Sequence, residues 1–203
     1  MHYLISAFLG YLLGCSNMAL YLSKWSGVDV RKGGSGNLGA SNVTMQLGWI
    51  AGVLTAVHDI GKAVLAVVLV RMLFPGAEYA GVLAGVACVM GHMFPFYLKF
   101  RGGKGFASYL GMILALNWKF ALVILILVAA VTIITDYIVA GTTLTIVASP
   151  VYLGITGGWI VALILGVATA VILYKHRMNY VRMYKGIEPG LRGAVRGDDR
   201  VKK

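Results

Sequence analysis

The sequence predicts an all-α, polytopic membrane protein with seven transmembrane helices, its N-terminus outside and its C-terminus in the cytoplasm. Of the 203 residues, 59% are apolar and only 12% are charged, whereas an ordinary soluble domain is about 45–50% apolar and about 25% charged. A bilayer is the solvent that accepts so much apolar surface. The lysines and arginines set the orientation, because cytoplasmic loops carry an excess of both.

Seven apolar segments follow one another along the chain. Five are near the length of about 20 residues that crosses a bilayer as a helix, while the fourth is clearly short and the fifth somewhat short. We expect the first to be a retained span, because it lacks the basic start and the cleavage site of a signal peptide. The segments are residues 2–22, 50–73, 79–98, 105–117, 119–135, 137–155 and 158–174.

The basic residues concentrate on one predicted side of the membrane, which holds fifteen of the eighteen lysines and arginines. The other side receives only Arg71 and Lys119, and Lys62 falls inside a span. The short fourth segment is therefore expected to cross, because otherwise the most basic part of the chain would lie outside. The fifteen divide into three in residues 24–48, three in 99–105 and nine from 175 onward.

The length predicts one domain, which we place at residues 1–185, followed by a basic, flexible cytoplasmic tail at residues 186–203. The net charge of +11 is expected to serve topology and contact with anionic lipid. Nucleic acid is not an expected partner, because no module that binds it is visible. Cys15 and Cys88 lie in apolar runs without ligand spacing, so we expect no metal site and no disulfide.

The first polar cluster is Gly33–Asn42, in the largest inside loop. Its glycines allow successive backbone N–H groups to converge on an anion. Ser41 or Asn42 is expected to cap a helix through residues 43–47, and the N-terminus of that helix would also favour an anion. A flexible loop that ends in a helix cap explains the same residues without a ligand.

The second polar cluster is Arg101–Gly105, in the next inside loop. Lys104 stands among three glycines, which offers a point charge beside open backbone donors and suits a phosphate group. The alternative is a basic inside loop with glycine turns. For His92, just before this loop, we favour a structural role over that of a general base.

The third polar cluster lies at the end of the last apolar segment. Residues three apart share a helical face, so His176 and Asn179 can point at one ligand. Lys175 and Arg177 are better explained as basic side chains that extend to the lipid headgroups. A headgroup role for His176 and Asn179 is the alternative to a site.

A fourth polar feature lies inside the second apolar segment, where ionisable side chains are costly. Asp59 and Lys62, three residues apart, can pair with each other. The alternative is that they line a polar cavity open to the cytoplasm. Separate loops thus bring polar and basic side chains to one face, which indicates a shared site for an anionic ligand.

The polar clusters together resemble the acyl-phosphate-dependent glycerol-3-phosphate acyltransferases of bacteria, a seven-span integral membrane family. The resemblance implies transfer of a fatty acyl group from acyl phosphate to the 1-hydroxyl of glycerol 3-phosphate, with lysophosphatidic acid and phosphate as products and no cofactor. The motifs extend over nearly the whole chain. They are Gly34–Asn42, Gly91–Pro95 followed by Arg101–Phe106, and Tyr174–Asn179, with Asp59 and Lys62 matching a further pattern.

The resemblance also implies the site residues. Ser35, Lys104, His176 and Asn179 are the expected catalytic residues: Lys104 would neutralise the leaving phosphate, and His176 with Asn179 would orient glycerol 3-phosphate or stabilise the oxyanion. The expected substrate-binding residues are Gly36, Asn37, Gly39, Asn42, Asp59, Lys62, His92, Arg101, Gly102, Gly103, Gly105 and Thr142.

The implied location is the inner (plasma) membrane of a bacterium, with the active site facing the cytoplasm. The expected partners are acyl phosphate, glycerol 3-phosphate and membrane lipids. Enzymes that form acyl phosphate or acylate the product are further candidate partners.

The sequence departs from the family pattern at several positions. Met45 and Asp136 stand where the pattern usually has arginine, Val139 stands in place of a serine, and Thr142 replaces another serine in part. Two alternatives follow: a divergent paralog with a different acceptor, and a non-catalytic protein that binds or transports lipid precursors. Against transport, the sequence shows no internal repeat of the kind many transporters have.

Overall fold

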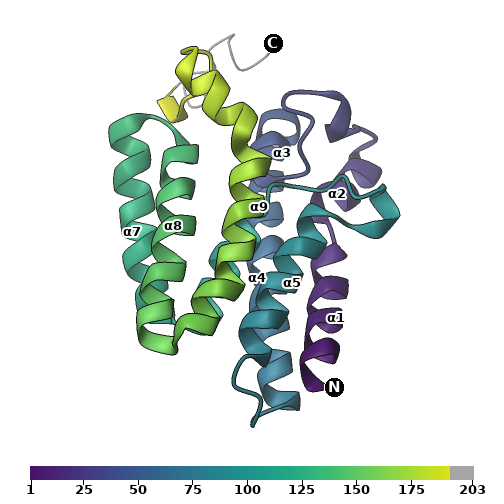
Figure 1. The fold of residues 1–203 in the computed structure, drawn as a ribbon. Helices are drawn as coiled ribbons and strands as arrows, with labels where there is room; N and C mark the ends of the chain where they lie inside the picture. Colours follow the sequence, from purple (N-terminus) through teal and green to yellow (C-terminus); the bar gives the residue numbers. More distant parts are fainter. Residues whose placement is uncertain (193–203) are drawn as a thin grey trace. The chain divides into compact units, whose positions relative to one another are not determined.

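The computed structural model describes residues 1–192, which form two compact units that divide after Trp118 (Figure 1). Every regular element among these residues is a helix, so the all-α prediction is confirmed. Six helical segments within this part of the chain are long and apolar enough to cross a membrane. They are His2–Ser26, Trp49–Leu73, Ala80–Leu98, Trp118–Thr135, Ile138–Gly157 and Trp159–Tyr184.

The first unit is built around α4, which packs against α3, α5 and α6, while α1 packs along α5. Two 3-10 turns, η1 and η2, lie in its loops. The elements are α1 (His2–Cys15), α2 (Met18–Ser26), η1 (Val30–Lys32), α3 (Ala40–Leu47), α4 (Trp49–Leu73), α5 (Ala80–Met93), η2 (Phe96–Leu98) and α6 (Phe106–Leu116).

Helices α1 and α5 approach each other through small residues. A Cβ added to Gly10 would overlap the backbone of Ala84, and one added to Gly14 would overlap the backbone of Cys88. Helices in lipid gain little from the hydrophobic effect when they associate, so close backbone packing at glycine takes its place. The spacing of these glycines therefore fixes how closely the two helices pack.

Two predicted spans of the first unit differ from a single helix of spanning length. The predicted span 2–22 is broken, because α1 ends at Cys15 and α2 starts after Asn17, whose side chain caps it by accepting a hydrogen bond from Leu20 N at 3.0 Å. The predicted span 105–117 is α6, with 11 residues, which extends about 16 Å along its axis. A hydrocarbon core is about 30 Å thick, so α6 is short for a span, as the sequence predicts for this segment.

The second unit consists of α7 (Trp118–Thr135), α8 (Ile138–Gly157) and α9 (Trp159–Tyr184). Helix α8 packs against α9. The last helix continues ten residues past the predicted end at residue 174, because its basic residues keep a helical backbone while their charged ends extend outward. Of the predicted tail, residues 193–203 lie outside the described part of the chain.

Candidate active site

Helix α3, which follows the first glycine cluster, starts differently from the prediction. It begins at Ala40, and its N-cap residue is Gly39, with no hydrogen bond from a capping side chain. The predicted cap by Ser41 or Asn42 is therefore wrong. Asn42 lies within the first helical turn instead, with its N–H donating to Gly39 O at 3.1 Å.

The buried side chain of Asn42 organises the loop before α3. Its Oδ1 accepts a hydrogen bond from Ser35 N at 2.9 Å, and its Nδ2 donates to Val30 O at 2.8 Å. Gln46 adds bonds from Nε2 to Val30 O at 2.7 Å and to Gly33 O at 2.9 Å. Two side chains of α3 thus hold the turn that carries Ser35.

Ser35 is exposed at the tip of this turn, between two glycines with positive φ. Gly34 has φ 56° and Gly36 has φ 66°, a region that glycine enters at little cost. The Gly36 N–H donates to Gly33 O at 3.0 Å. The predicted phosphate contact at Gly36 N would therefore share this donor with the turn, whereas the Ser35 side chain faces outward.

The second glycine loop covers the C-terminal end of α5. Gly102 N donates to Met93 O at 3.0 Å, and Gly103 N donates to His92 O at 3.1 Å. These bonds satisfy carbonyls that the end of a helix leaves without intrahelical partners. The same contacts fix the backbone directly before Lys104, whose side chain is half-buried, while Arg101 is exposed.

The two loops lie at the same end of the first unit (Figure 1). Leu38 and Val43, which follow Ser35 in the chain, belong to a buried cluster, and Leu98 of η2 packs against that cluster. The structure therefore brings the Ser35 turn and the segment that leads into the Lys104 loop into one packed region. Sequence analysis predicted this grouping from topology.

A buried polar network lies beneath the Lys104 loop. Lys62 Nζ is 2.7 Å from Asp59 Oδ1, 2.9 Å from His92 Nδ1 and 2.8 Å from Ser16 O. The pairing of Asp59 with Lys62 that their spacing predicts is formed. Lys62, Asp59 and His92 are each at most 6% exposed, so these three side chains lie inside the unit and not on a loop surface.

In the second unit, α9 presents His176 and Asn179 on one buried face, as their spacing predicts. His176 Nδ1 is 2.9 Å from Ile172 O. A carbonyl only accepts hydrogen bonds, so Nδ1 carries the proton and the basic lone pair of the neutral ring is on Nε2. Such a ring can accept a proton at Nε2.

Glu188 is a residue of this region that the sequence analysis missed. Its carboxylate accepts hydrogen bonds from Asn179 Nδ2 at 2.5 Å and from Arg182 Nε at 2.6 Å. The bond to Glu188 uses one of the two N–H donors of the Asn179 amide and fixes the direction in which the amide points. Glu188 is the single acidic residue between positions 137 and 197, which is the signal that could have identified it.

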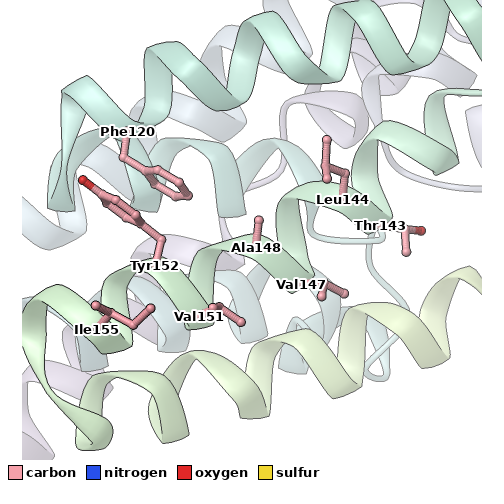
Figure 2. Close-up of a pocket in the computed structure, with 8 residues that line it drawn as sticks. All are labelled: Phe120, Thr143, Leu144, Val147, Ala148, Val151, Tyr152 and Ile155. Carbon is pink, nitrogen blue, oxygen red and sulfur yellow. The ribbon is translucent and has the colours of Figure 1, made fainter.

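Thr142 is buried on α8, and its hydroxyl donates to Ile138 O at 3.1 Å. The next residue lines an apolar pocket of about 520 Å³ in the second unit. Figure 2 shows Thr143 and Leu144 at one end of the pocket and the rings of Phe120 and Tyr152 at the other. These two rings stack with centroids 4.2 Å apart.

Arg31 of the first loop is held by an acid and contributes little positive charge to the site. Its Nε and NH2 donate to the two oxygens of Asp29 at 2.8 and 2.9 Å. These hydrogen bonds lower the pKa of Asp29 from 3.8 to about 2. At neutral pH both Asp29 and Arg31 are therefore charged, and their opposite charges nearly cancel.

The two positions that depart from the family pattern differ in their surroundings. Asp136 follows α7 with φ 69°, its Oδ1 accepts from Arg192 N at 2.8 Å, and its backbone O accepts from Leu191 N at 2.8 Å. Asp136 thus fastens the chain that follows α9 to the second unit. Met45 is a 38% exposed side chain on α3, and nothing in the structure explains it.

Comparison with known proteins decides the family. Residues 4–186 match the protein-family model described as Glycerol-3-phosphate acyltransferase. The chain belongs to this family. A glycerol-3-phosphate acyltransferase from Clostridioides difficile is 39% identical over 194 residues, covering 92% of this chain and 94% of that protein. One from Deinococcus radiodurans is 39% identical over 187 residues, covering 91% and 93%.

Solved structures agree with the sequence comparison. A crystal structure of PlsY, an integral membrane glycerol 3-phosphate acyltransferase, in its glycerol 3-phosphate form is 30% identical, with a TM-score of 0.89 over 98% of this chain and all of that chain. The lysophosphatidic acid form is 29% identical, with a TM-score of 0.84 over 94% of this chain and 95% of that chain. The resemblance inferred from motifs is thereby confirmed.

Proposed function

We propose that this chain transfers a fatty acyl group from an acyl phosphate to the 1-hydroxyl of glycerol 3-phosphate in phospholipid synthesis. Acylation of glycerol 3-phosphate rests on the match over nearly the whole chain to an acyltransferase solved with that substrate. The acyl-phosphate donor is the finer part of the proposal. Two glycine loops at one end of the first unit support it, because they suit a phosphate leaving group.

The reaction needs positioning and charge stabilisation more than a protein nucleophile, since an acyl phosphate is already activated. The glycerol hydroxyl attacks the acyl carbon, an ester C–O bond forms and the C–O bond to phosphate breaks. Ser35 and the adjacent turn, Lys104 and Thr142 hold the phosphate, and Lys104 neutralises its growing charge. The hydroxyl proton passes to the departing phosphate or to His176.

The acceptor contacts are assigned to α9. The lone pair on His176 Nε2 suits proton acceptance, since Nδ1 faces Ile172 O. The amide of Asn179 hydrogen-bonds a glycerol hydroxyl, and Glu188, which accepts from Nδ2, holds that amide in place. Gly39, Asn42, Asp59, Lys62, His92, Arg101, Gly102, Gly103 and Gly105 support the phosphate loops in this proposal.

The apolar pocket of the second unit is our candidate for the acyl chain. Its lining along α8 runs from Thr143, beside the proposed phosphate ligand Thr142, to Ile155, a length of about 18 Å at the helical rise. Acyl chains of one leaflet extend about 15 Å, half of the hydrocarbon core. The pocket and the chain are therefore similar in length, with the polar end next to Thr142.

We further propose seven spans, with α6 as the seventh, an outside N-terminus and a cytoplasmic C-terminus in the bacterial inner membrane. The lysine and arginine distribution supports this orientation. In this arrangement residues 1–185 act as one acyltransferase domain, and the active site faces the cytoplasm. Enzymes that make acyl phosphate or consume lysophosphatidic acid are its candidate partners.

A product assay tests the reaction. The purified protein in detergent receives palmitoyl phosphate and glycerol 3-phosphate, and released phosphate and lysophosphatidic acid are measured. Lys104→Ala and His176→Ala are each expected to lower kcat about 100- to 1000-fold, by analogy with the loss of one positioned donor. Near-normal turnover in both variants would contradict the assigned roles, and a parent that makes lipid product only with another acceptor would point to a divergent paralog.

A further inference from the structure

We infer that Lys62 is a positioning residue: through His92 it fixes the Gly102–Gly105 loop and thereby the place of Lys104. The inference rests on the proposed function, because it gives Lys104 its role. It also changes the expected role of Lys62, from a substrate-binding residue to one that acts without touching substrate. Four features of the first unit carry it.

The first feature is that Lys62 has used all of its donors. An ammonium group has three N–H donors and no acceptor, and Nζ lies within 2.9 Å of Ser16 O, Asp59 Oδ1 and His92 Nδ1. The side chain is 6% exposed. A substrate phosphate could bind Lys62 only by displacing one of these partners, so direct substrate binding is the weaker explanation.

The second feature is the orientation of the His92 ring. His92 Nδ1 lies 2.9 Å from Lys62 Nζ and 3.3 Å from Asp59 Oδ1, so the buried ion pair holds this edge of the ring. Nε2 is the atom nearest to the position that a Cβ on Gly103 would occupy, well inside contact distance. The His92 ring therefore lies directly against Gly103, with Nε2 on the loop side and Nδ1 on the side of the ion pair.

The third feature is that two backbone hydrogen bonds join the loop to the end of α5. Gly103 N donates to His92 O at 3.1 Å, and Gly102 N donates to Met93 O at 3.0 Å. A side chain at Gly103 has no room, because the His92 ring fills that space. If the ring shifts, Gly103 must shift with it, and Lys104 is the next residue in the chain.

The fourth feature is that the network lies where two helices of the first unit end. Helix α1 ends at Cys15 and α5 ends at Met93, so carbonyls that need a partner from outside their own helix gather there. Lys62 Nζ donates a hydrogen bond to Ser16 O, and the Tyr97 hydroxyl donates to Cys15 O at 2.6 Å. The network thus stabilises a break in the helices, and the Lys104 loop is built on this break.

Kinetics of the full-length protein in detergent test the inference. Lys62→Met removes the ammonium and keeps an unbranched apolar side chain, and Lys24→Met is the matched control, because Lys24 is an exposed lysine on α2. We expect Lys62→Met to lower kcat on the order of 100-fold, the cost of a misplacement of about 1 Å, with little change in KM. Lys24→Met should keep the parent kcat.

A double-mutant cycle separates positioning from other roles. If Lys62 acts through Lys104, then Lys62→Met should lower kcat no further in a Lys104→Ala background. Gly103→Ala should reproduce the loss, because its Cβ displaces the ring. The inference would be overturned if the kcat losses of Lys62→Met and Lys104→Ala multiplied in the double variant. It would also be overturned if Lys62→Met raised KM and left kcat unchanged, because that pattern marks lost substrate binding.

A spin label keeps the inference testable without activity. The label is attached at Arg101→Cys, which is exposed, whereas Cys15 and Cys88 are buried. Greater label mobility in Lys62→Met is expected, and unchanged mobility would overturn the inference. If Lys62→Met fails to fold, the double variant Asp59→Asn/Lys62→Met is used in its place, because it leaves no single charge buried without a partner. If the parent protein makes no lipid product, the proposed function is refuted but this inference is not, because label mobility reports on the loop directly.

Discussion

The first unit buries charged side chains, whereas the buried polar groups of the second unit are neutral hydroxyls, a histidine and an asparagine among the described residues. In the first unit, Asp59 and Lys62 form an ion pair, and Lys62 also donates to Ser16 O at the break between α1 and α2. In the second, Thr142, Thr145 and Ser149 donate to carbonyls four residues earlier on α8. Such bonds leave the helix continuous.

The difference shows what each unit has to stabilise. Broken helices expose backbone groups that cost several kcal/mol each in lipid, so the first unit needs strong donors at a fixed depth. The helices of the second unit are unbroken, and Ile146 O, which Pro150 leaves without an N–H partner in α8, accepts from Thr169 Oγ1 of α9 at 2.6 Å. Helix α9 can then present His176 and Asn179 on a regular surface. Removing a polar group should therefore cost more in the first unit than in the second.

The largest expected effect is on the buried ion pair. Lys62→Met leaves the Asp59 carboxylate without its ammonium partner, and breaking one side of a buried pair costs about 3–5 kcal/mol. Thermal unfolding in detergent should show a large fall in Tm. Asp59→Asn/Lys62→Met removes both charges and should recover most of the loss. A double variant no more stable than Lys62→Met would contradict this account of the pair.

The network also marks the limit of what sequence could predict. Spacing three residues apart on a helix predicts the Asp59–Lys62 contact, because α-helical geometry is local. The contact with Ser16 O depends on where α1 breaks, and the apolar pattern of residues 2–22 gave no sign of the break except Asn17 as a capping residue. His92 joins from 30 positions away along the chain, which no local pattern encodes.

The loops show the same division between local and tertiary information. Glycines predicted both turns, since positive φ and close approach favour glycine. The mistaken cap at Ser41 or Asn42 arose because the side chain of Asn42 bonds across the loop to Ser35 instead of to its own helix. Likewise, the contact between Glu188 and Asn179 forms because the chain folds back after α9. The basic residues on both sides of Glu188 predicted a flexible tail instead.

The next effect concerns glycine packing in the first unit. Gly14→Ala puts a Cβ into the Cys88 backbone, and overpacking of this kind costs about 1–3 kcal/mol. Gly166→Ala in α9 is the matched control, because nothing lies within 4 Å of its Cβ position, and it should be neutral or stabilise by about 0.5–1 kcal/mol. Unfolding curves that rank the two variants in the reverse order would refute close packing of α1 on α5.

The smallest effect is expected at the hydroxyl contact between α8 and α9. Thr143 Oγ1 donates to Val139 O at 2.8 Å, so the Tyr180 hydroxyl, 2.8 Å from Oγ1, must be the donor in their own contact. Tyr180→Phe should cost about 0.6 kcal/mol, the average of interhelical hydrogen bonds in membrane proteins. Thr143→Val tests the same bond from the other side.

A double-mutant cycle on Thr143→Val and Tyr180→Phe isolates this bond, because each change alone also alters local packing. The coupling free energy from thermal unfolding should be well below the cost of breaking the Asp59–Lys62 pair. A coupling of equal size would mean that neutral hydroxyls in the second unit stabilise it as strongly as the buried charges stabilise the first. The contrast between a helix break held by ions and continuous helices joined by hydroxyls would then no longer explain where the two units draw their stability.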